Sequence, residues 1–128
     1  MMDWCEKVKN AKRILICGSR NWVDRETMEN VFKHIDDSII IEGQCKGADL
    51  MAAELAEGKN LCIERYPANW EKYGRSAGPI RNQQMIKIGK PDIVLVFHEA
   101  LASSRGTKNM MKYAKEVGIT TFIFTANK

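Results

Sequence analysis

Three short segments of this chain combine glycine, hydroxyl and cationic side chains in a way that suits a phosphate group. They are Gly18-Ser19-Arg20, the turn from Gly43 to Gly47, and Ser103-Ser104-Arg105-Gly106-Thr107. Glycine lets backbone N–H groups approach phosphate oxygens, and arginine binds phosphate through two parallel N–H groups. Each segment alone is explained better as an ordinary turn carrying a solvated cation. The three segments would form a phosphate-binding site only if the fold brings them together.

The order of apolar and polar runs predicts that these segments converge. Apolar runs at 12–18, 38–42, 61–66, 92–97 and 120–124 are typical of buried strands. Helical patterns lie between them: one after Asp24 with Met28, Val31, Phe32 and Ile35 on one face, then Ala48 to Gly58, Pro79 to about Gly89, and one after Gly106. Residues 1–11 form a short helical or irregular lead-in. We expect a Rossmann-like three-layer α/β/α sandwich with a mainly parallel five-stranded sheet, as a single domain over residues 1–128. In such folds the loops after the strands meet at the carboxyl edge of the sheet, where ligands bind.

The segment from Ala68 to Gly78 is predicted to be a long polar connection. It contains Trp70, Tyr73 and Arg75, and connections of this length are uncommon unless they are functional. Between Arg65 and Arg81 there are four cations and one anion, Glu71, which concentrates positive charge in this part of the chain.

Composition limits the classes of function. The chain has 128 residues with 20 Lys and Arg against 16 Asp and Glu, a formal net charge of +4. This charge fits an anionic small ligand and is weak support for nucleic acid. Neither a secretory signal nor a membrane-spanning run is visible, so we expect a cytoplasmic protein without a membrane partner.

The four cysteines are scattered and no histidine lies at metal-ligand spacing, so no disulfide framework or metal site is predicted. Cys17 and Cys62 lie in apolar runs and are predicted to be core residues, whereas Cys45 lies in a turn and is a candidate reactive thiol. The chain has no G-x-G-x-x-G and no Walker A lysine, and we expect no bound cofactor.

The ordered motifs together resemble one family. They are Gly18-Ser19-Arg20-x-Trp22-x-Asp24, Gly43-x-x-x-Gly47-Ala48-Asp49, Tyr66-Pro67-Ala68-x-Trp70, Tyr73-Gly74-Arg75-x-Ala77-Gly78-Pro79-x-Arg81-Asn82-x-x-Met85, and Gly106-Thr107-x-x-Met110. The chain is similar, from residue 13 to about 118, to the SLOG superfamily and to its YspA-like branch of small stand-alone domains. The resemblance implies a Rossmann-like fold that binds nucleotides or nucleotide-derived ligands, often as a homodimer or higher homo-oligomer.

Two related families imply different activities. LOG (Lonely Guy) phosphoribohydrolases are similar through an Arg-x-x-x-Met element, matched by Arg81 and Met85, but their catalytic glutamate is replaced here by Met110. Methionine supplies no negative charge to an oxocarbenium-like transition state, so such an enzyme would need Asp49, Glu99 or His98 instead. The DNA-processing protein A family is similar through Gly-Ser-Arg, Gly-Ala-Asp and Arg81-Asn82, and its members bind single-stranded DNA. One further departure is Gln44, where the related motif has a second glycine.

We therefore expect a binding protein for a nucleotide or nucleotide-derived molecule such as an ADP-ribose relative. Its alternatives are a nucleotide N-glycosidase and a single-stranded nucleic-acid binder. Ser19, Arg20, Gly47 and Thr107 are expected to hold phosphate. Arg81 and Asn82 clamp ribose or phosphate, Asp49 accepts a hydrogen bond from a ribose hydroxyl, and Trp22 or Trp70 covers the base, although each tryptophan is also explained as a core residue. The full predicted ligand-binding set is Gly18, Ser19, Arg20, Trp22, Gly43, Lys46, Gly47, Asp49, Arg75, Arg81, Asn82, Gly106 and Thr107.

Overall fold

A five-stranded parallel sheet forms the centre of the computed structural model, which describes residues 3–101 and 104–126. The strands are β1 (Arg13–Gly18), β2 (Ile39–Glu42), β3 (Ile63–Arg65), β4 (Ile93–Phe97) and β5 (Thr120–Phe124), in the order β3-β2-β1-β4-β5. All four neighbouring pairs are parallel. The Rossmann-like α/β fold is thus confirmed, with a sheet that is entirely parallel.

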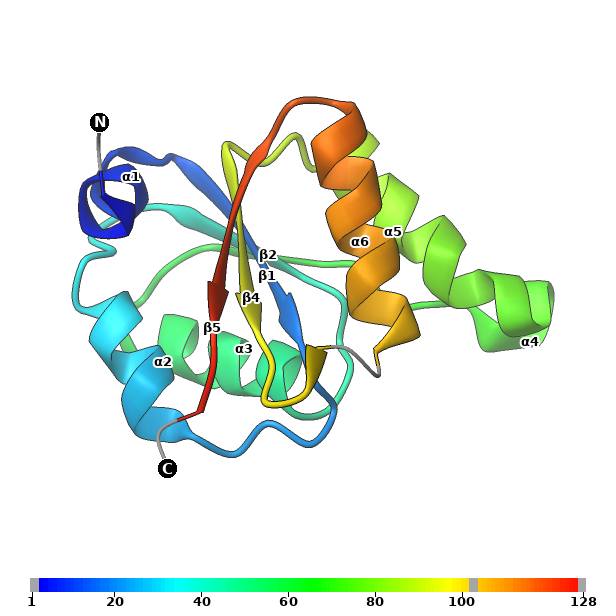
Figure 1. Ribbon diagram of the computed structural model, residues 1–128, viewed down its shortest axis with the longest axis horizontal. Helices are drawn as coiled ribbons and strands as arrows, with labels where there is room; N and C mark the ends of the chain where they lie inside the picture. The colour runs from blue at the N-terminus through cyan, green and yellow to red at the C-terminus, as the bar shows by residue number, and fades with distance from the viewer. Residues whose placement is uncertain (1–2, 102–103, 127–128) are drawn as a thin grey trace.

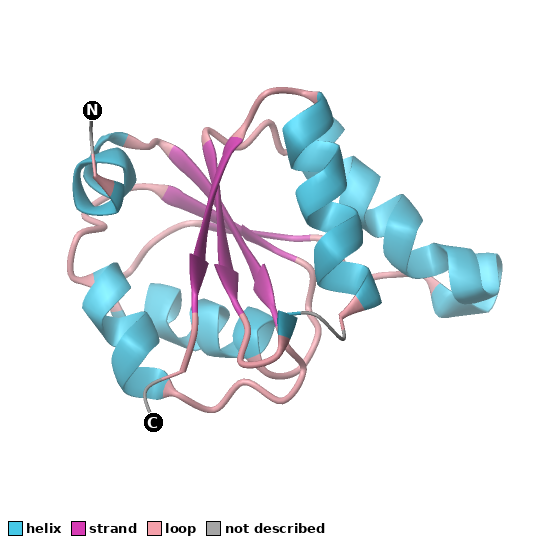
Figure 2. Cartoon of the chain, viewed as in Figure 1, coloured by secondary structure: helices cyan, strands magenta, loops and turns pink. Residues whose placement is uncertain are grey.

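Helices cover both faces of the sheet (Figures 1 and 2). Their bounds are α1 (Trp4–Asn10), α2 (Arg25–Phe32), α3 (Ala48–Gly58), α4 (Trp70–Tyr73), the 3₁₀ turn η1 (Gly74–Ser76), α5 (Ala77–Lys87) and α6 (Arg105–Glu116). Side-chain caps explain several of the starts, because Asp3, Asp24 and Ser104 each accept a hydrogen bond from a backbone N–H three residues later. Within the described residues, every helix is too short or too polar to cross a lipid bilayer.

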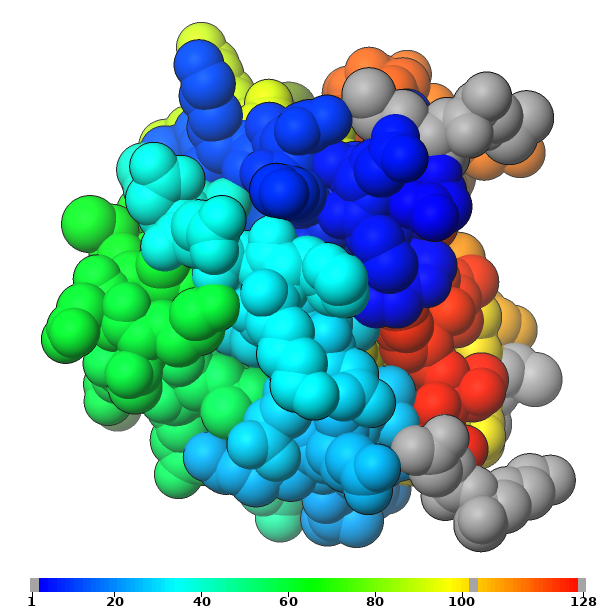
Figure 3. All heavy atoms as spheres, turned by 90° about the vertical axis from the view of Figure 1, so that its left-hand side faces the viewer, coloured from blue at the N-terminus to red at the C-terminus, as the bar shows by residue number. Residues whose placement is uncertain are grey.

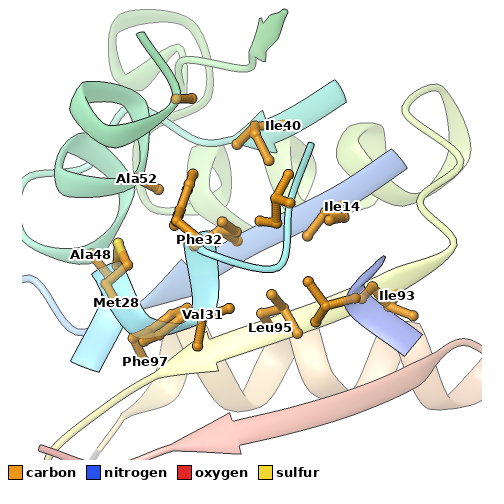
Figure 4. Packing of buried hydrophobic residues seen from close by; sticks show 14 of the residues in the cluster. Ile14, Met28, Val31, Phe32, Ile40, Ala48, Ala52, Ile93, Leu95 and Phe97 are labelled. Atoms are coloured by element: carbon orange, nitrogen blue, oxygen red, sulfur yellow. The ribbon is translucent and has the colours of Figure 1, made fainter. Parts of the chain in front are cut away.

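The core lies in two layers, one on each face of the sheet. On one face, α1, α2 and α3 pack against alternate strand residues such as Ile14, Leu95 and Phe97 (Figure 4). Seen from the left-hand side of Figure 1, the blue N-terminal segment lies next to the light-blue to cyan segment that includes α2 (Figure 3). On the other face, α5 and α6 lie side by side over Leu15, Val94 and the neighbouring strand residues. Burial of apolar surface on both faces is the main stabilising contribution.

The predicted irregular connection from Ala68 to Gly78 contains helical turns. Asn69 caps α4 through its side chain, since its Oδ1 accepts a hydrogen bond from Lys72 N. Gly74, with φ of 55°, ends α4, and η1 leads directly into α5. The segment extends away from the sheet (Figure 1), so it does not lie over the carboxyl edge as a lid would.

One cysteine prediction is wrong. Cys17 is buried as expected, but Cys62 is exposed. Cys62 precedes β3, which is only three residues long and forms an edge of the sheet. A short edge strand leaves part of its apolar run outside the core.

Candidate functional site

A cavity of about 430 Å³ opens at the carboxyl ends of β1 and β4, beside the first turn of α6. Register explains this position, since Gly18 at the end of β1 is paired with Phe97 at the end of β4. The residues that follow these two strands therefore lie next to each other. The cavity is lined by Cys17, Gly18, Ser19, Arg20, Asn21, Cys45, Asp49, Arg81, Asn82, Met85, His98, Glu99, Ala100, Ser104, Arg105, Gly106, Thr107 and Met110.

The turn after β1 packs tightly against β4. Ser19 N donates a hydrogen bond to Phe97 O at 2.9 Å. A Cβ on Gly18 would lie 1.9 Å from the same carbonyl oxygen. Only glycine fits at this position, because any side chain would push the two strands apart.

Ser19 and Glu99 join the ends of the two strands through their side chains. Ser19 Oγ donates to Glu99 Oε1 at 2.7 Å and accepts from Asn21 N at 2.9 Å. The hydrogen bond from Ser19 is the main reason why the pKa of Glu99 is lowered. Next to it, His98 Nδ1 accepts from Ala100 N at 2.9 Å, which places the proton of the neutral ring on Nε2.

The turn between β2 and α3 is held by Asp49. Its Oδ2 accepts hydrogen bonds from Gly43 N at 3.1 Å and from Cys45 N at 3.2 Å. Burial raises the pKa of Asp49 to about 7, and the nearby Glu42 acts in the same direction, while the two backbone N–H groups and Arg81 oppose the shift. A carboxyl with this pKa can act as an acid or a base near neutral pH.

Gln44 does not line the cavity. It has a φ of 62°, in the left-handed region where glycine is usual. Its backbone N and its side-chain Nε2 both donate to the buried Glu42 carboxylate. The side chain that replaces the second glycine of the related motif therefore satisfies a buried acid and does not narrow the site.

Arg81 and Asn82 lie at the wall formed by α5, and both are buried. The Arg81 guanidinium donates to Gly43 O through Nη1 and to Asn82 Oδ1 through Nε, the latter at 3.0 Å. Asn82 Nδ2 reaches α6, where it donates to Gly106 O at 3.3 Å and to Asn109 Oδ1 at 3.1 Å. Arg81 thus supplies charge to the cavity, whereas Asn82 connects the two helices that border it.

The first turn of α6 closes the remaining side. Ser104 Oγ caps the helix by accepting from Thr107 N at 3.1 Å, and Thr107 and Met110 are buried against the cavity. The N-terminal end of a helix carries positive potential that favours anions. Ser103, the first residue of the segment predicted to suit phosphate, lies outside the described residues.

Three arginines reach the cavity from three separate elements: Arg20 after β1, Arg81 in α5 and Arg105 at the start of α6. Arg20 and Arg105 are exposed, so each can change conformation to meet a ligand. Asp49 and Glu99 supply two carboxyl groups to the same cavity. The site combines cations suited to phosphate with acceptors suited to hydroxyl groups.

Eight of the thirteen predicted ligand-binding residues line the cavity: Gly18, Ser19, Arg20, Asp49, Arg81, Asn82, Gly106 and Thr107. Gly43 and Gly47 do not line the cavity, but they fix the position of residues that do. Gly43 O accepts from Arg81, and Gly47, with φ of 84°, allows Ala48 N to donate to Ser19 O at 3.0 Å. Lys46 and Arg75 are exposed and do not line it.

The structure places neither tryptophan over the cavity. Trp22 is only 2% exposed, packs edge-on against Phe97 and donates from Nε1 to Asp24 O at 3.0 Å. It is a core residue, since the chain after Arg20 turns toward the face covered by α2 and α3. Trp70 is 50% exposed on α4 and is likewise absent from the lining.

The predicted ligand-binding set omits several residues that line the cavity, among them Asn21, Cys45 and Met85. Asn21 follows the predicted Gly-Ser-Arg turn directly, so its position could have been inferred. Cys45 Sγ lies 3.6 Å from both Nη atoms of Arg81, a contact between the β2–α3 turn and α5 that no local pattern indicates.

Burial strongly raises the pKa of the buried Cys17 thiol, so that thiol stays protonated. Among the described residues, no group of three or more His, Cys, Asp or Glu side chains is placed to hold a metal ion.

Comparisons with known proteins agree with this description. A model of the YspA, cpYpsA-related SLOG family matches residues 12–73. The Gene 61 protein of Mycobacterium phage D29 is 34% identical over 123 residues, which cover 88% of this chain and 96% of the phage protein. No solved structure matches the chain significantly. The family match includes the turns after β1 and β2, and the likeness to the phage protein extends over most of the chain.

Proposed function

The chain belongs to the YspA, cpYpsA-related SLOG family, and on that premise we propose that its cavity binds a nucleotide or a nucleotide-derived molecule such as an ADP-ribose relative. The observation that carries the proposal is the convergence of Arg20, Arg81 and Arg105 on one cavity at the carboxyl edge of the sheet. Parallel α/β sheets bind ligands at this edge.

The parts of the ligand are assigned by charge. Its phosphate contacts the three arginines and the first turn of α6, since guanidinium groups and a helix N-terminus both favour phosphate. The volume of about 430 Å³ is in the range of small-ligand pockets. The base is bound without a tryptophan cover, because Trp22 is in the core and Trp70 is distant from the lining.

Calorimetric titration with AMP, ADP and ADP-ribose tests this function. Arg20→Ala and Arg105→Ala should each lower affinity by about tenfold, as expected for the loss of one charged hydrogen bond. Both side chains are exposed, so the fold should tolerate the changes. The matched control is Arg25→Ala, since Arg25 is equally exposed but pairs with Glu54 outside the cavity. No binding at millimolar ligand, or equal affinity in all four proteins, would reject the proposal.

A second candidate is hydrolysis of a nucleotide N-glycosidic bond, which one observation favours. Asp49 lines the cavity with a pKa of about 7, close to the value that suits a general acid or base at neutral pH. Incubation with AMP and chromatography of the products would detect released adenine. Asp49→Asn should abolish release, while the amide oxygen can still accept from the β2–α3 turn. Unchanged AMP at high protein concentration would leave binding as the function.

Binding of single-stranded DNA is the remaining alternative, and it has a different signature. Its affinity should fall steeply with added salt because counterions are released when phosphates are neutralised. A gel shift with that salt dependence, unaffected by Arg20→Ala and Arg105→Ala, would favour it over the cavity.

A further inference from the structure

Glu99 is a carboxylate in a cavity that otherwise suits anions. It follows β4 directly, lines the cavity, and is fixed by the hydrogen bond of 2.7 Å that its Oε1 accepts from Ser19 Oγ. The same hydrogen bond lowers the pKa of Glu99, so the group is ionised at neutral pH. An ionised carboxylate at this wall repels phosphate and attracts hydrogen-bond donors.

The Ser19 hydroxyl cannot serve as a phosphate donor while this arrangement holds. A hydroxyl has one proton, and that of Ser19 is directed to Glu99. The Ser19 oxygen also accepts from Asn21 N at 2.9 Å. Although its type and position suggest a phosphate contact, Ser19 therefore acts by holding the carboxylate in place.

No arginine neutralises Glu99 within the part of the chain that the structure describes. The ion-pair contact of Glu99 among these residues is with His98, whose Nδ1 lies 4.0 Å from Glu99 Oε2. That nitrogen accepts a hydrogen bond from Ala100 N, so it has no proton to give to Glu99. A carboxylate has several acceptor positions, so Glu99, which lines the cavity, can accept further hydrogen bonds.

We propose that Glu99, positioned by Ser19, accepts hydrogen bonds from the ribose hydroxyls of the bound nucleotide, so that the site selects ribonucleotides over deoxyribonucleotides. This inference rests on the proposed nucleotide-binding function. A carboxylate has two oxygens and can accept from two neighbouring hydroxyls. Two walls then recognise different parts of one ligand: the arginines hold phosphate, and the ends of β1 and β4 hold the sugar.

Matched pairs of nucleotides test the proposal. AMP, GMP and CMP are each titrated against their 2′-deoxy counterparts, and AMP also against 3′-deoxy-AMP, by calorimetry. The unmodified protein should bind each ribonucleotide about tenfold or more tightly than its deoxy form, the ratio expected for one charged hydrogen bond. Glu99→Ala, a change at an exposed position, should bring this ratio close to one. Ser19→Ala should reduce the ratio partly, because the carboxylate remains but is no longer fixed.

The outcomes separate this inference from the function on which it rests. Equal affinity for ribo- and deoxyribonucleotides, with the loss on Arg20→Ala retained, would overturn the ribose assignment and leave nucleotide binding intact. If Glu99→Ala left the ratio of ribonucleotide to deoxyribonucleotide affinity unchanged, the ribose assignment would also be overturned. A uniform change in all affinities with that ratio unchanged would mean that Glu99 acts by charge alone. No binding of any nucleotide would reject both proposals.

Discussion

Gly47 controls the turn that leads into α3. Its φ is 84°, and a Cβ at this position would lie 2.2 Å from Ser19 O and 2.6 Å from Arg20 O. Gly47→Ala should therefore lower the free energy of unfolding by about 2 kcal/mol or more, since both strain and overlap with the backbone act against it. Urea unfolding followed by circular dichroism measures the change.

Gly58 is the matched control for this prediction. It is the last residue of α3, and a Cβ there would meet nothing within 4 Å. Gly58→Ala should leave stability unchanged or raise it by about 0.5–1 kcal/mol, because alanine favours the helix over the unfolded chain. If the two variants were equally stable, the tight contact between the β1 and β2 turns would be absent in solution.

Asp49 makes stability depend on pH. Its pKa is raised from 3.8 to about 7 in the fold, chiefly by burial. Below the unfolded value the carboxyl is protonated in both states. As pH rises from about 4 to about 7, it ionises only in the unfolded chain, so the contribution of Asp49 to the free energy of unfolding falls and then levels off.

Asp49→Asn removes this proton linkage. Urea unfolding of both proteins at several pH values between 4 and 8 should show the wild type losing stability relative to the variant across that interval. Glu42, whose pKa burial also raises, is present in both proteins, so the difference between them reports Asp49 together with its coupling to Glu42. A difference that stays constant with pH would contradict the raised pKa of Asp49.

At the scale of elements, Asn82 connects α5 to α6. Its side chain donates to Gly106 O and Asn109 Oδ1 and accepts from Arg81 Nε. Asn82→Ala should cost about 1–3 kcal/mol, because it leaves the buried Arg81 Nε and two partners on α6 without these hydrogen bonds. It should also weaken nucleotide binding by loosening Arg81. Denaturant unfolding and calorimetry measure the two effects.

Gln83 gives a comparison on the same two helices. Its Nε2 donates to Tyr113 OH at 3.1 Å, but this contact is exposed. Gln83→Ala should change stability by less than about 0.5 kcal/mol, as surface substitutions usually do. Equal losses in the two variants would show that the connection depends on contact between the helices in general and not on the buried amide.

The elements themselves differed in how well they could be predicted. The pattern of Met28, Val31, Phe32 and Ile35 was clear because all four side chains are buried in the core. The helix itself ends at Phe32, so Ile35 reaches the core from the segment that follows α2. The helical turns of α4 and η1 were missed, since α4 is four residues long and buries none of them, so no apolar period marks it. Trp22 was also ambiguous in the sequence, because a tryptophan near a turn fits a core position and a base-stacking position equally well.

The site was predictable where residues follow a strand and less so where they come from a helix. The sequence predicts the β1 turn as part of the site because strand ends mark the carboxyl edge. It suggests Glu99 only as a replacement for the catalytic glutamate of LOG enzymes. The bonds of Arg81 with Gly43 and Cys45 depend on how α5 packs against the β2–α3 turn, which no local pattern specifies. Likewise, the position of Glu99 beside Ser19 depends on the register of β1 against β4.

At the scale of the whole molecule, the cavity links distant parts of the chain. Its lining extends from Cys17 to Met110 and includes residues from β1, α3, α5 and α6. A ligand that contacts all of these elements binds only the folded chain. AMP at 100 times its dissociation constant should therefore raise the free energy of unfolding by about 2.7 kcal/mol. For a chain of this size, the melting temperature should rise by roughly 10 °C.

The arginine variants decide whether this stabilisation arises in the cavity. If Arg20→Ala weakens binding tenfold, the same AMP concentration should stabilise that variant by only about 1.4 kcal/mol. Arg25→Ala, whose side chain lies outside the cavity, should keep the full effect. Sodium chloride at equal ionic strength controls for general screening of the net charge of +4. Equal stabilisation of all three proteins by AMP would mean that AMP binds elsewhere, because a ligand held by Arg20 must lose part of its linkage to folding when that side chain is removed.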